Sequence, residues 1–111
     1  MPIANCFIKD KKVSQQELQQ LAEKWASDAE VDVKDICLTF IPNCIQAGQQ
    51  YIALVNLYLP SLWNDEQIHH IQKSLLRIIC EFLRVESSEV FIMTSMIQSG
   101  HVVESGEIVK W

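Results

Sequence analysis

The sequence predicts an α+β (α/β) fold in which two β-α-β repeats form a four-stranded mixed sheet, with both helices on one face and a C-terminal β-hairpin. Three observations predict it: two apolar helical stripes, apolar extended segments flanking both, and the similar tetrapeptides Ile45–Gly48 and Ile97–Gly100. A strand–helix–strand crossover makes its two strands parallel. The 111 residues are expected to form one domain, with pseudo-repeats over about 2–48 and 51–100 and a hairpin over about 100–111.

The first repeat opens with the strand candidate Pro2–Ile8. Ser14 and Glu17 have the spacing of a capping box, which predicts a helix over about 15–29. Cys37–Ile41 is the second strand candidate. The helix stripe recurs every three or four residues and consists of Leu18, Leu21, Ala22, Trp25 and Ala29.

The second repeat has the same plan. Its strand candidate Tyr51–Leu59 is followed by a cap at Asn64 with Gln67 three residues later, which predicts a helix over about 65–83. Phe91–Thr94 is the last strand candidate of the sheet. The second stripe consists of Ile68, Ile71, Leu75, Ile78, Ile79 and Phe82. Matching connectors, Val31–Ile36 and Val85–Val90, follow the two helices, so the unit is a repeat.

Composition excludes several classes of function. The 9 Lys/Arg against 14 Asp/Glu give a net charge of −5, which argues against binding nucleic acid or an anionic membrane. No apolar run approaches the ~20 residues of a membrane span, and no signal peptide is evident, so the cytoplasm is the expected location. The four cysteines are irregularly spaced, so we expect buried small hydrophobes and no metal site.

The apolar pattern of the strands indicates an oligomer. Pro2–Ile8 and Ile52–Val55 carry apolar residues on both faces, whereas the two helices cover only one face of the sheet. Other subunits are therefore expected to cover the open face. The tail forms the hairpin, with a turn at Glu104–Glu107, and Trp111 either tucks into its own chain or, as we expect, contacts a neighbouring subunit.

Pro2 directly follows the initiator methionine, which aminopeptidases remove before small residues. Its secondary amine would then be a terminal amine with a pKa near ~7.7–8.0, lowered further by burial. Such a group accepts protons at neutral pH. The simpler alternative is a proline that only occupies a strand edge, and retention of Met1 would leave an amide without a basic nitrogen.

The repeated β-α-β unit behind Met-Pro resembles the tautomerase superfamily over nearly the whole chain. Pro2–Ile8 is similar to the first strand of 4-oxalocrotonate tautomerase, and Thr94–Met96 with Gly100-His101 resembles its second strand and following turn. The two-unit length resembles the macrophage migration inhibitory factor branch. The elements Phe40–Pro42 and Glu104–Glu107 are most similar to those of an uncharacterised bacterial branch.

This resemblance implies a homotrimer with a sheet-lined barrel and pockets at the subunit boundaries, each with Pro2 as catalytic base. The arginine that binds substrate carboxylate is replaced by Lys12, which keeps the charge without the bidentate fork. Cys37 stands where the second arginine falls, and Val102 where the aromatic beside the proline falls. In the migration-factor branch, a pocket tyrosine and asparagine fall at Phe91 and Met93 here, and the pocket lysine falls near Lys34.

The expected chemistry is cofactor-free removal of a proton next to a carbonyl by Pro2. Lys12, or second to it Lys34, would bind a carboxylate or stabilise the enolate, although a solvated lysine turn is the alternative for Lys12. Phe40, Phe91 or Val102 would exclude water, and His101 either reaches the pocket or is solvated. The chain is thus expected to be a tautomerase acting on a small 2-oxo acid or enol. The alternative is a non-catalytic trimer that binds a small ligand or a protein partner.

Overall fold

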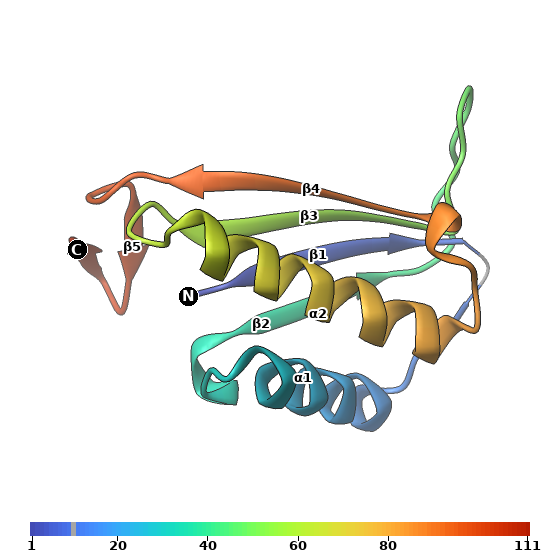
Figure 1. Ribbon diagram of the computed structural model, residues 1–111, viewed down its shortest axis with the longest axis horizontal. Helices are drawn as coiled ribbons and strands as arrows, with labels where there is room; N and C mark the ends of the chain where they lie inside the picture. The colour runs from blue at the N-terminus through green and yellow to red at the C-terminus, as the bar shows by residue number, and fades with distance from the viewer. Residues whose placement is uncertain (10) are drawn as a thin grey trace.

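The computed structural model describes residues 1–9 and 11–111; Asp10 lies outside the described residues. The helices and strands, in chain order, are β1 Ile3–Ile8, α1 Gln15–Ala29, β2 Cys37–Ile41, β3 Ala53–Pro60, α2 Asp65–Leu83, β4 Val90–Ile97, β5 Val102–Glu104 and β6 Glu107–Val109 (Figure 1). Short 3₁₀ turns over Val33–Asp35 and Ser87–Glu89 precede β2 and β4.

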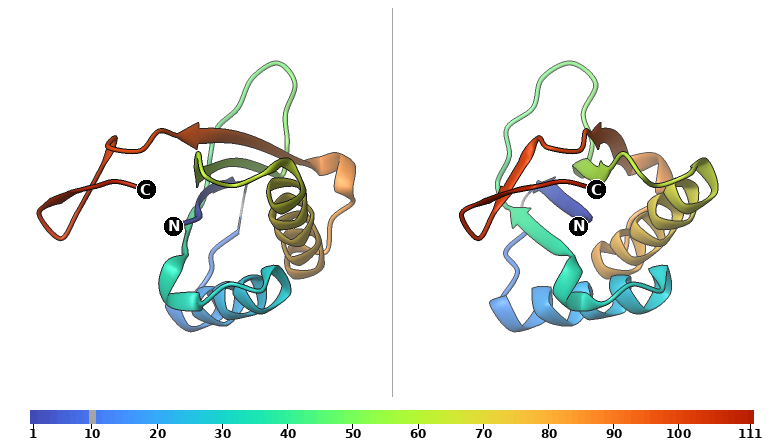
Figure 2. Two further views of the ribbon diagram at one scale, coloured as in Figure 1. Left: turned by 60° about the vertical axis from the view of Figure 1, so that its left-hand side comes forward. Right: turned by 90° about the vertical axis from the view of Figure 1, so that its left-hand side faces the viewer.

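The sheet has the strand order β2-β1-β3-β4. The β1–β2 and β3–β4 pairs are parallel, and the β1–β3 pair that joins the two halves is antiparallel. Both helices cover the same face, as Figure 2 shows from two sides. β5 and β6 form a separate antiparallel hairpin. The predicted mixed sheet, one-sided helix layer and C-terminal hairpin are all confirmed.

Both helices begin where their capping boxes predict. The Glu17 amide donates to Ser14 Oγ at 3.1 Å, while the Ser14 amide donates to Glu17 Oε1 at 3.1 Å. Asn64 and Gln67 form the equivalent reciprocal pair at 2.8 and 3.0 Å. Each box satisfies two backbone N–H groups that a helix start leaves without partners, which fixes the first turn of α1 and of α2.

The helix ends are also alike. Glu30 and Arg84, the residues after the last turns, both adopt the left-handed conformation, with φ of 59° and 57°. Glycine is the usual residue at such a position because it has no Cβ to crowd the backbone. Here the chain uses a charged residue twice, and a 3₁₀ turn follows a few residues later in each half.

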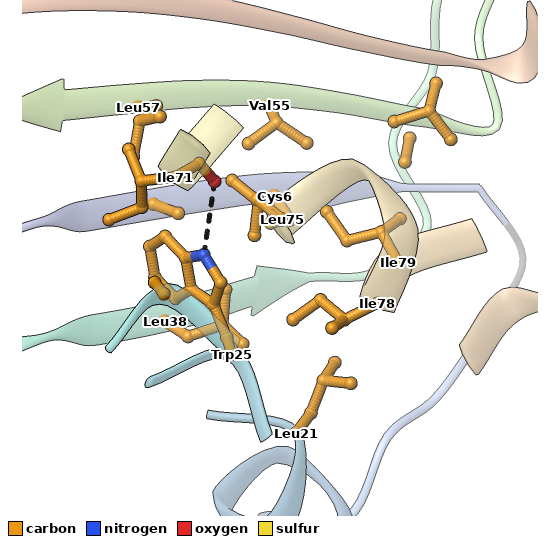
Figure 3. Packing of buried hydrophobic residues seen from close by; sticks show 14 of the residues in the cluster. Cys6, Leu21, Trp25, Leu38, Val55, Leu57, Ile71, Leu75, Ile78 and Ile79 are labelled. Atoms are coloured by element: carbon orange, nitrogen blue, oxygen red, sulfur yellow. Dashed lines mark hydrogen bonds between the residues drawn. The ribbon is translucent and has the colours of Figure 1, made fainter. Parts of the chain in front are cut away.

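The hydrophobic core lies between the helices and the covered face of the sheet. β1 contributes every second residue, Ala4, Cys6 and Ile8, and all three are buried. Trp25 is fully buried at the centre of the helix pair (Figure 3). The other core residues, drawn from α1, α2 and the strands, are Leu21, Ala29, Leu38, Ala53, Val55, Leu57, Leu59, Ile71, Leu75, Ile78, Ile79 and Val90.

The open face of the sheet is formed by the alternate residues. In its middle row, Asn5 lies opposite Thr39 of β2 on one side and Asn56 of β3 on the other, and Asn56 lies opposite Met93 of β4. Apolar side chains extend from this face, with exposed fractions of 52% for Met93, 39% for Phe91 and 37% for Ile41. The face therefore carries exposed apolar side chains on both edge strands, β2 and β4, with a polar row through its centre.

The two ends of the sheet differ. Both chain termini and the hairpin lie at one end, and the loop 42–52 projects from the other (Figure 1). Trp111 is held by its own chain, because its indole donates to Ser61 Oγ at 3.0 Å and its amide donates to Ser99 Oγ at 2.8 Å. Trp111 therefore contacts its own chain, which is the alternative to the expected contact with a neighbouring subunit.

Candidate functional site

The N-terminus lies beside a cavity of about 320 Å³ at the end of the sheet that holds the termini. The start of β1, the 3₁₀ turn before β2, the start of β2 and the hairpin strand β5 surround it. The residues that line the cavity are Met1, Ile3, Lys34, Asp35, Ile36, Cys37, Val102, Val103 and Glu104.

Parallel pairing brings these segments together. Ile3 lies opposite Cys37, and the Cys37 amide donates to the Pro2 carbonyl at 3.0 Å, so the two strands start at the same edge. β4 runs parallel to β3 and antiparallel to β1, so its carboxyl end delivers the hairpin to this edge. The topology thus brings the terminal residue and the turn 33–35 to one edge, and the hairpin folds back so that β5 completes the cavity.

Pro2 is fully buried, and its nitrogen is part of the Met1–Pro2 amide in the chain described here. The free amine is that of Met1. Burial lowers the pKa of the Met1 amine, while the carboxylates of Asp35 and Glu104 oppose this by stabilising the ammonium form. The environment of the terminal amine therefore combines partial desolvation with two nearby acids.

The polar side chains of the cavity are unevenly charged. Lys34 is its one cationic side chain, whereas Asp35 and Glu104 both carry carboxylates. Among residues 1–9 and 11–111, the ion pairs within 4.0 Å are Lys24–Glu81 and Arg77–Asp28, so none of these three groups is neutralised by direct pairing. Cys37 is exposed, with its Sγ 3.9 Å from Thr39 Oγ1.

The structure brings together three of the residues expected at the site. Lys34 and Val102 line the cavity, and Pro2, although not in the lining, lies between the lining residues Met1 and Ile3. His101 lies at the same end of the sheet but is exposed and outside the cavity lining.

Lys12, Phe40 and Phe91 lie at the opposite end of the sheet, because β1 and β2 run away from the cavity and β4 begins far from it (Figure 1). Phe40 faces the helices and contacts Phe82, with ring centroids 6.0 Å apart. Phe91 lies on the open face against Tyr51, at 5.0 Å. Within one chain, these three residues do not share a site with Pro2.

The two carboxylates of the cavity, Asp35 and Glu104, were not anticipated from the sequence. A usable indication was present, because residues that immediately precede parallel strands gather at one edge of a sheet. Asp35 precedes β2 in the same way that Met1 and Pro2 precede β1. Glu104 required knowing how the hairpin folds back, which its sequence does not specify.

A larger cavity, of about 390 Å³, lies on the helix side, between the end of α1 and the start of α2. Its polar residues include Glu30, Glu66 and His70, and the imidazole of His70 is already hydrogen-bonded at 3.1 Å to the Asp28 carbonyl. We favour the smaller cavity because it adjoins the chain's terminal amine. In the part of the chain that the structure describes, no group of three His, Cys, Asp or Glu side chains is arranged to hold a metal ion.

No protein-family model and no curated protein matches the sequence. Solved structures do match the fold. The wild-type asymmetric trimer of R7 fused 4-OT aligns with a TM-score of 0.78 at 10% identity, covering 96% of this chain and 94% of that one. Pt0534 inactivated by 2-oxo-3-pentynoate aligns at 0.75 and 12% identity, with the same coverage.

A third structure, macrophage migration inhibitory factor from Oncomelania hupensis, aligns with a TM-score of 0.76 at 9% identity and covers 98% of this chain and 82% of that one. The chain therefore has the tautomerase fold. Among the described residues, no helix is both long and apolar enough to cross a membrane.

Proposed function

We propose that this protein, after removal of Met1, is a cofactor-free tautomerase or related isomerase that uses Pro2 as general base on a small 2-oxo acid or enol. The observation that carries the proposal is the position of Pro2 directly before β1, between Met1 and Ile3, which both line the cavity. Removing Met1 would convert the buried amide nitrogen of Pro2 into a secondary amine facing that cavity. The tautomerase fold supports the same assignment.

The proposed reaction needs no group beyond the chain. The Pro2 nitrogen takes a proton from the carbon next to a carbonyl, and the electron pair of that C–H bond moves to the carbonyl oxygen as an enolate forms. The Pro2 ammonium then returns the proton to a different atom of the substrate. Lys34 is the cation of the cavity that would stabilise the enolate oxygen, and Val102 belongs to its apolar wall.

The same proposal includes a homotrimer in the cytoplasm. Its support is the uncovered sheet face, where Phe91, Met93 and Ile41 are exposed beside a helix layer that covers only the other side. The fused 4-OT structures that share the fold are trimers. Because Lys12, Phe40 and Phe91 lie far from Pro2 within one chain, they could act at the cavity only if a neighbouring subunit contributed them.

The alternative is a non-catalytic trimer of this fold that binds a small ligand or a protein partner. The observation that favours it is the cavity's polar lining, in which an exposed thiol, Cys37, stands where the resemblance places an arginine. Retention of Met1 would favour the same reading, because the Pro2 nitrogen would remain an amide.

The test joins intact mass to turnover, using untagged protein. We expect the mass of the chain without Met1, ketonisation of the phenylpyruvate enol, and loss of that activity in Pro2→Ala with the oligomer unchanged. Treatment with 2-oxo-3-pentynoate, which inactivates Pt0534, should add one reagent mass at Pro2. Retained Met1 would overturn the proline-base proposal, and processed chain with neither turnover nor adduct would support the binding alternative.

A further inference from the structure

The charge around the cavity changes when Pro2 acts as a base. A proline that accepts a proton must first be uncharged, so the terminal amine then contributes no positive charge. Within one chain, Lys34 is left as one cation against the two carboxylates of Asp35 and Glu104, and neither carboxylate is within 4.0 Å of a cationic partner among the described residues. In its reactive state the lining is therefore net negative.

The two carboxylates approach from different elements. Asp35 ends the 3₁₀ turn before β2, and Glu104 ends β5, where it lies opposite Glu107 of β6. Both stabilise the ammonium form of the Met1 amine, and Met1 is bonded directly to the Pro2 nitrogen. A substrate that occupies the place of Met1 in the cavity is therefore exposed to both carboxylates.

The remaining wall offers an anion little compensation. Its side chains are apolar at Ile3, Ile36, Val102 and Val103, and Cys37 supplies a thiol where a guanidinium would bind a carboxylate in a bidentate way. A lysine holds an anion as a single point charge. A carboxylate on the substrate would thus gain one cation and meet two like charges, which disfavours its binding.

We propose that this cavity selects uncharged enolisable carbonyl compounds over their carboxylate-bearing analogues, and that Asp35 and Glu104 are the residues that set this specificity. The inference rests on the proposed function and narrows its substrate class from 2-oxo acids and enols to neutral ketones, aldehydes and their enols. Lys34 is then available to the enolate oxygen, because a neutral substrate carries no carboxylate that would also bind this lysine.

A matched pair of substrates tests this selectivity. Phenylpyruvate and 1-phenylpropan-2-one share the same benzylic C–H group beside a carbonyl, and a methyl group in the second replaces the carboxylate of the first. Exchange of the benzylic protons in deuterium oxide, followed by NMR, reports enolisation of both. For each compound, kcat/KM is divided by the rate of buffer-catalysed exchange of that compound. We expect this ratio to be larger for the neutral ketone. Raising the ionic strength should narrow the difference, because salt screens the carboxylates.

The charge variants locate the cause. Glu104→Gln and Asp35→Asn should each shift the ratio of kcat/KM for phenylpyruvate to kcat/KM for the ketone roughly 3- to 10-fold towards phenylpyruvate. Glu107→Gln is the matched control, since Glu107 is exposed on the same hairpin but does not line the cavity. A wild-type preference for phenylpyruvate, or a ratio of the two substrates unaffected by both cavity variants, would overturn the proposal.

Binding separates this inference from the proposed function. Dissociation constants for the two compounds, measured by NMR titration of wild type and of Pro2→Ala, do not require turnover. Absence of exchange with the neutral compound still bound more tightly would overturn the proline-base function while supporting the selectivity. Exchange that favours phenylpyruvate would support the function and overturn the selectivity, and failure to bind either compound would overturn both.

Discussion

The indole nitrogen of Trp25, on α1, donates a hydrogen bond to the carbonyl oxygen of Ile71, on α2, at 3.4 Å inside the core (Figure 3). Trp25 is fully buried, so this bond satisfies a polar group that has no access to water. The same side chain fills the space between the helices and the sheet. It therefore contributes to stability by its volume and by positioning α1 against α2.

Substitution of Trp25 separates these two contributions. Trp25→Ala should lower the free energy of unfolding by about 3–5 kcal/mol, because it opens a cavity in a close-packed core. Trp25→Phe should lower the free energy of unfolding by less, because phenylalanine keeps most of the apolar volume. It also removes the N–H donor of the indole. Urea unfolding followed by circular dichroism measures both. Trp111→Phe is the control at a half-buried surface position, and an equal loss there would contradict the assignment of Trp25 to the core.

The two capping boxes should contribute equally. Ser14→Ala and Asn64→Ala each remove the acceptor for an N3 amide, and each should destabilise the protein by about 0.5–2 kcal/mol. Gln15→Ala, at the first position of α1 where the side chain makes no capping bond, serves as control. Thermal unfolding of the three variants checks this, and a Gln15 effect as large as the Ser14 effect would contradict it.

Cys6 should make stability fall in alkaline solution. Burial raises the pKa of its thiol from 9.0 to about 12. Well below pH 9.0 the thiol is protonated in both states. Above it, the unfolded chain loses the proton that the folded chain retains, so the free energy of unfolding declines as pH rises towards about 12. In Cys6→Ala, the free energy of unfolding should fall less between neutral and alkaline pH than it does in wild type. Cys37→Ala, at an exposed thiol, should leave the slope unchanged.

A charge on the open sheet face should dissociate the oligomer. Met93 is 52% exposed at the end of the row that contains Asn5 and Asn56, so Met93→Lys would place an ammonium group in the proposed subunit contact. We expect light scattering coupled to size exclusion to show a trimer for wild type and a monomer for the variant. Leu62→Lys, which is exposed in the loop after β3, should remain trimeric. A wild-type monomer would contradict the proposed assembly.

Most of the fold was predictable because its determinants are local. The boxes at Ser14 and Asn64 set the helix starts within the sequence itself, and the apolar stripes identify the buried helix faces. Strand ends were less certain: β3 begins at Ala53 rather than Tyr51, because Tyr51 instead bonds through its backbone to the side chain of Gln46. Strand limits depend on such neighbours, which periodicity does not reveal.

The site was predictable only in part, because it depends on which ends of the strands meet. Lys34 and Val102, which the family resemblance suggests as site residues, line the cavity, and their roles there stay predictions. The resemblance places Lys12 where an arginine binds the substrate carboxylate, yet the length of β1 separates Lys12 from Pro2 within the chain. Asp35 and Glu104 carry ordinary surface charges in sequence, and only the hairpin's return to the N-terminus shows that they act on the same cavity.

The antiparallel β1–β3 pair has a consequence for chain connectivity. It joins the two halves of the sheet, while the loop 42–52 provides their covalent link and both original termini lie at the opposite end (Figure 1). A circular permutant that opens this loop and bridges Trp111 to Pro2 with a short linker would retain every strand pairing. Its Pro2 nitrogen would nevertheless be part of a peptide bond. The order of the strands along the chain, rather than their arrangement in space, therefore determines whether the fold has a basic proline.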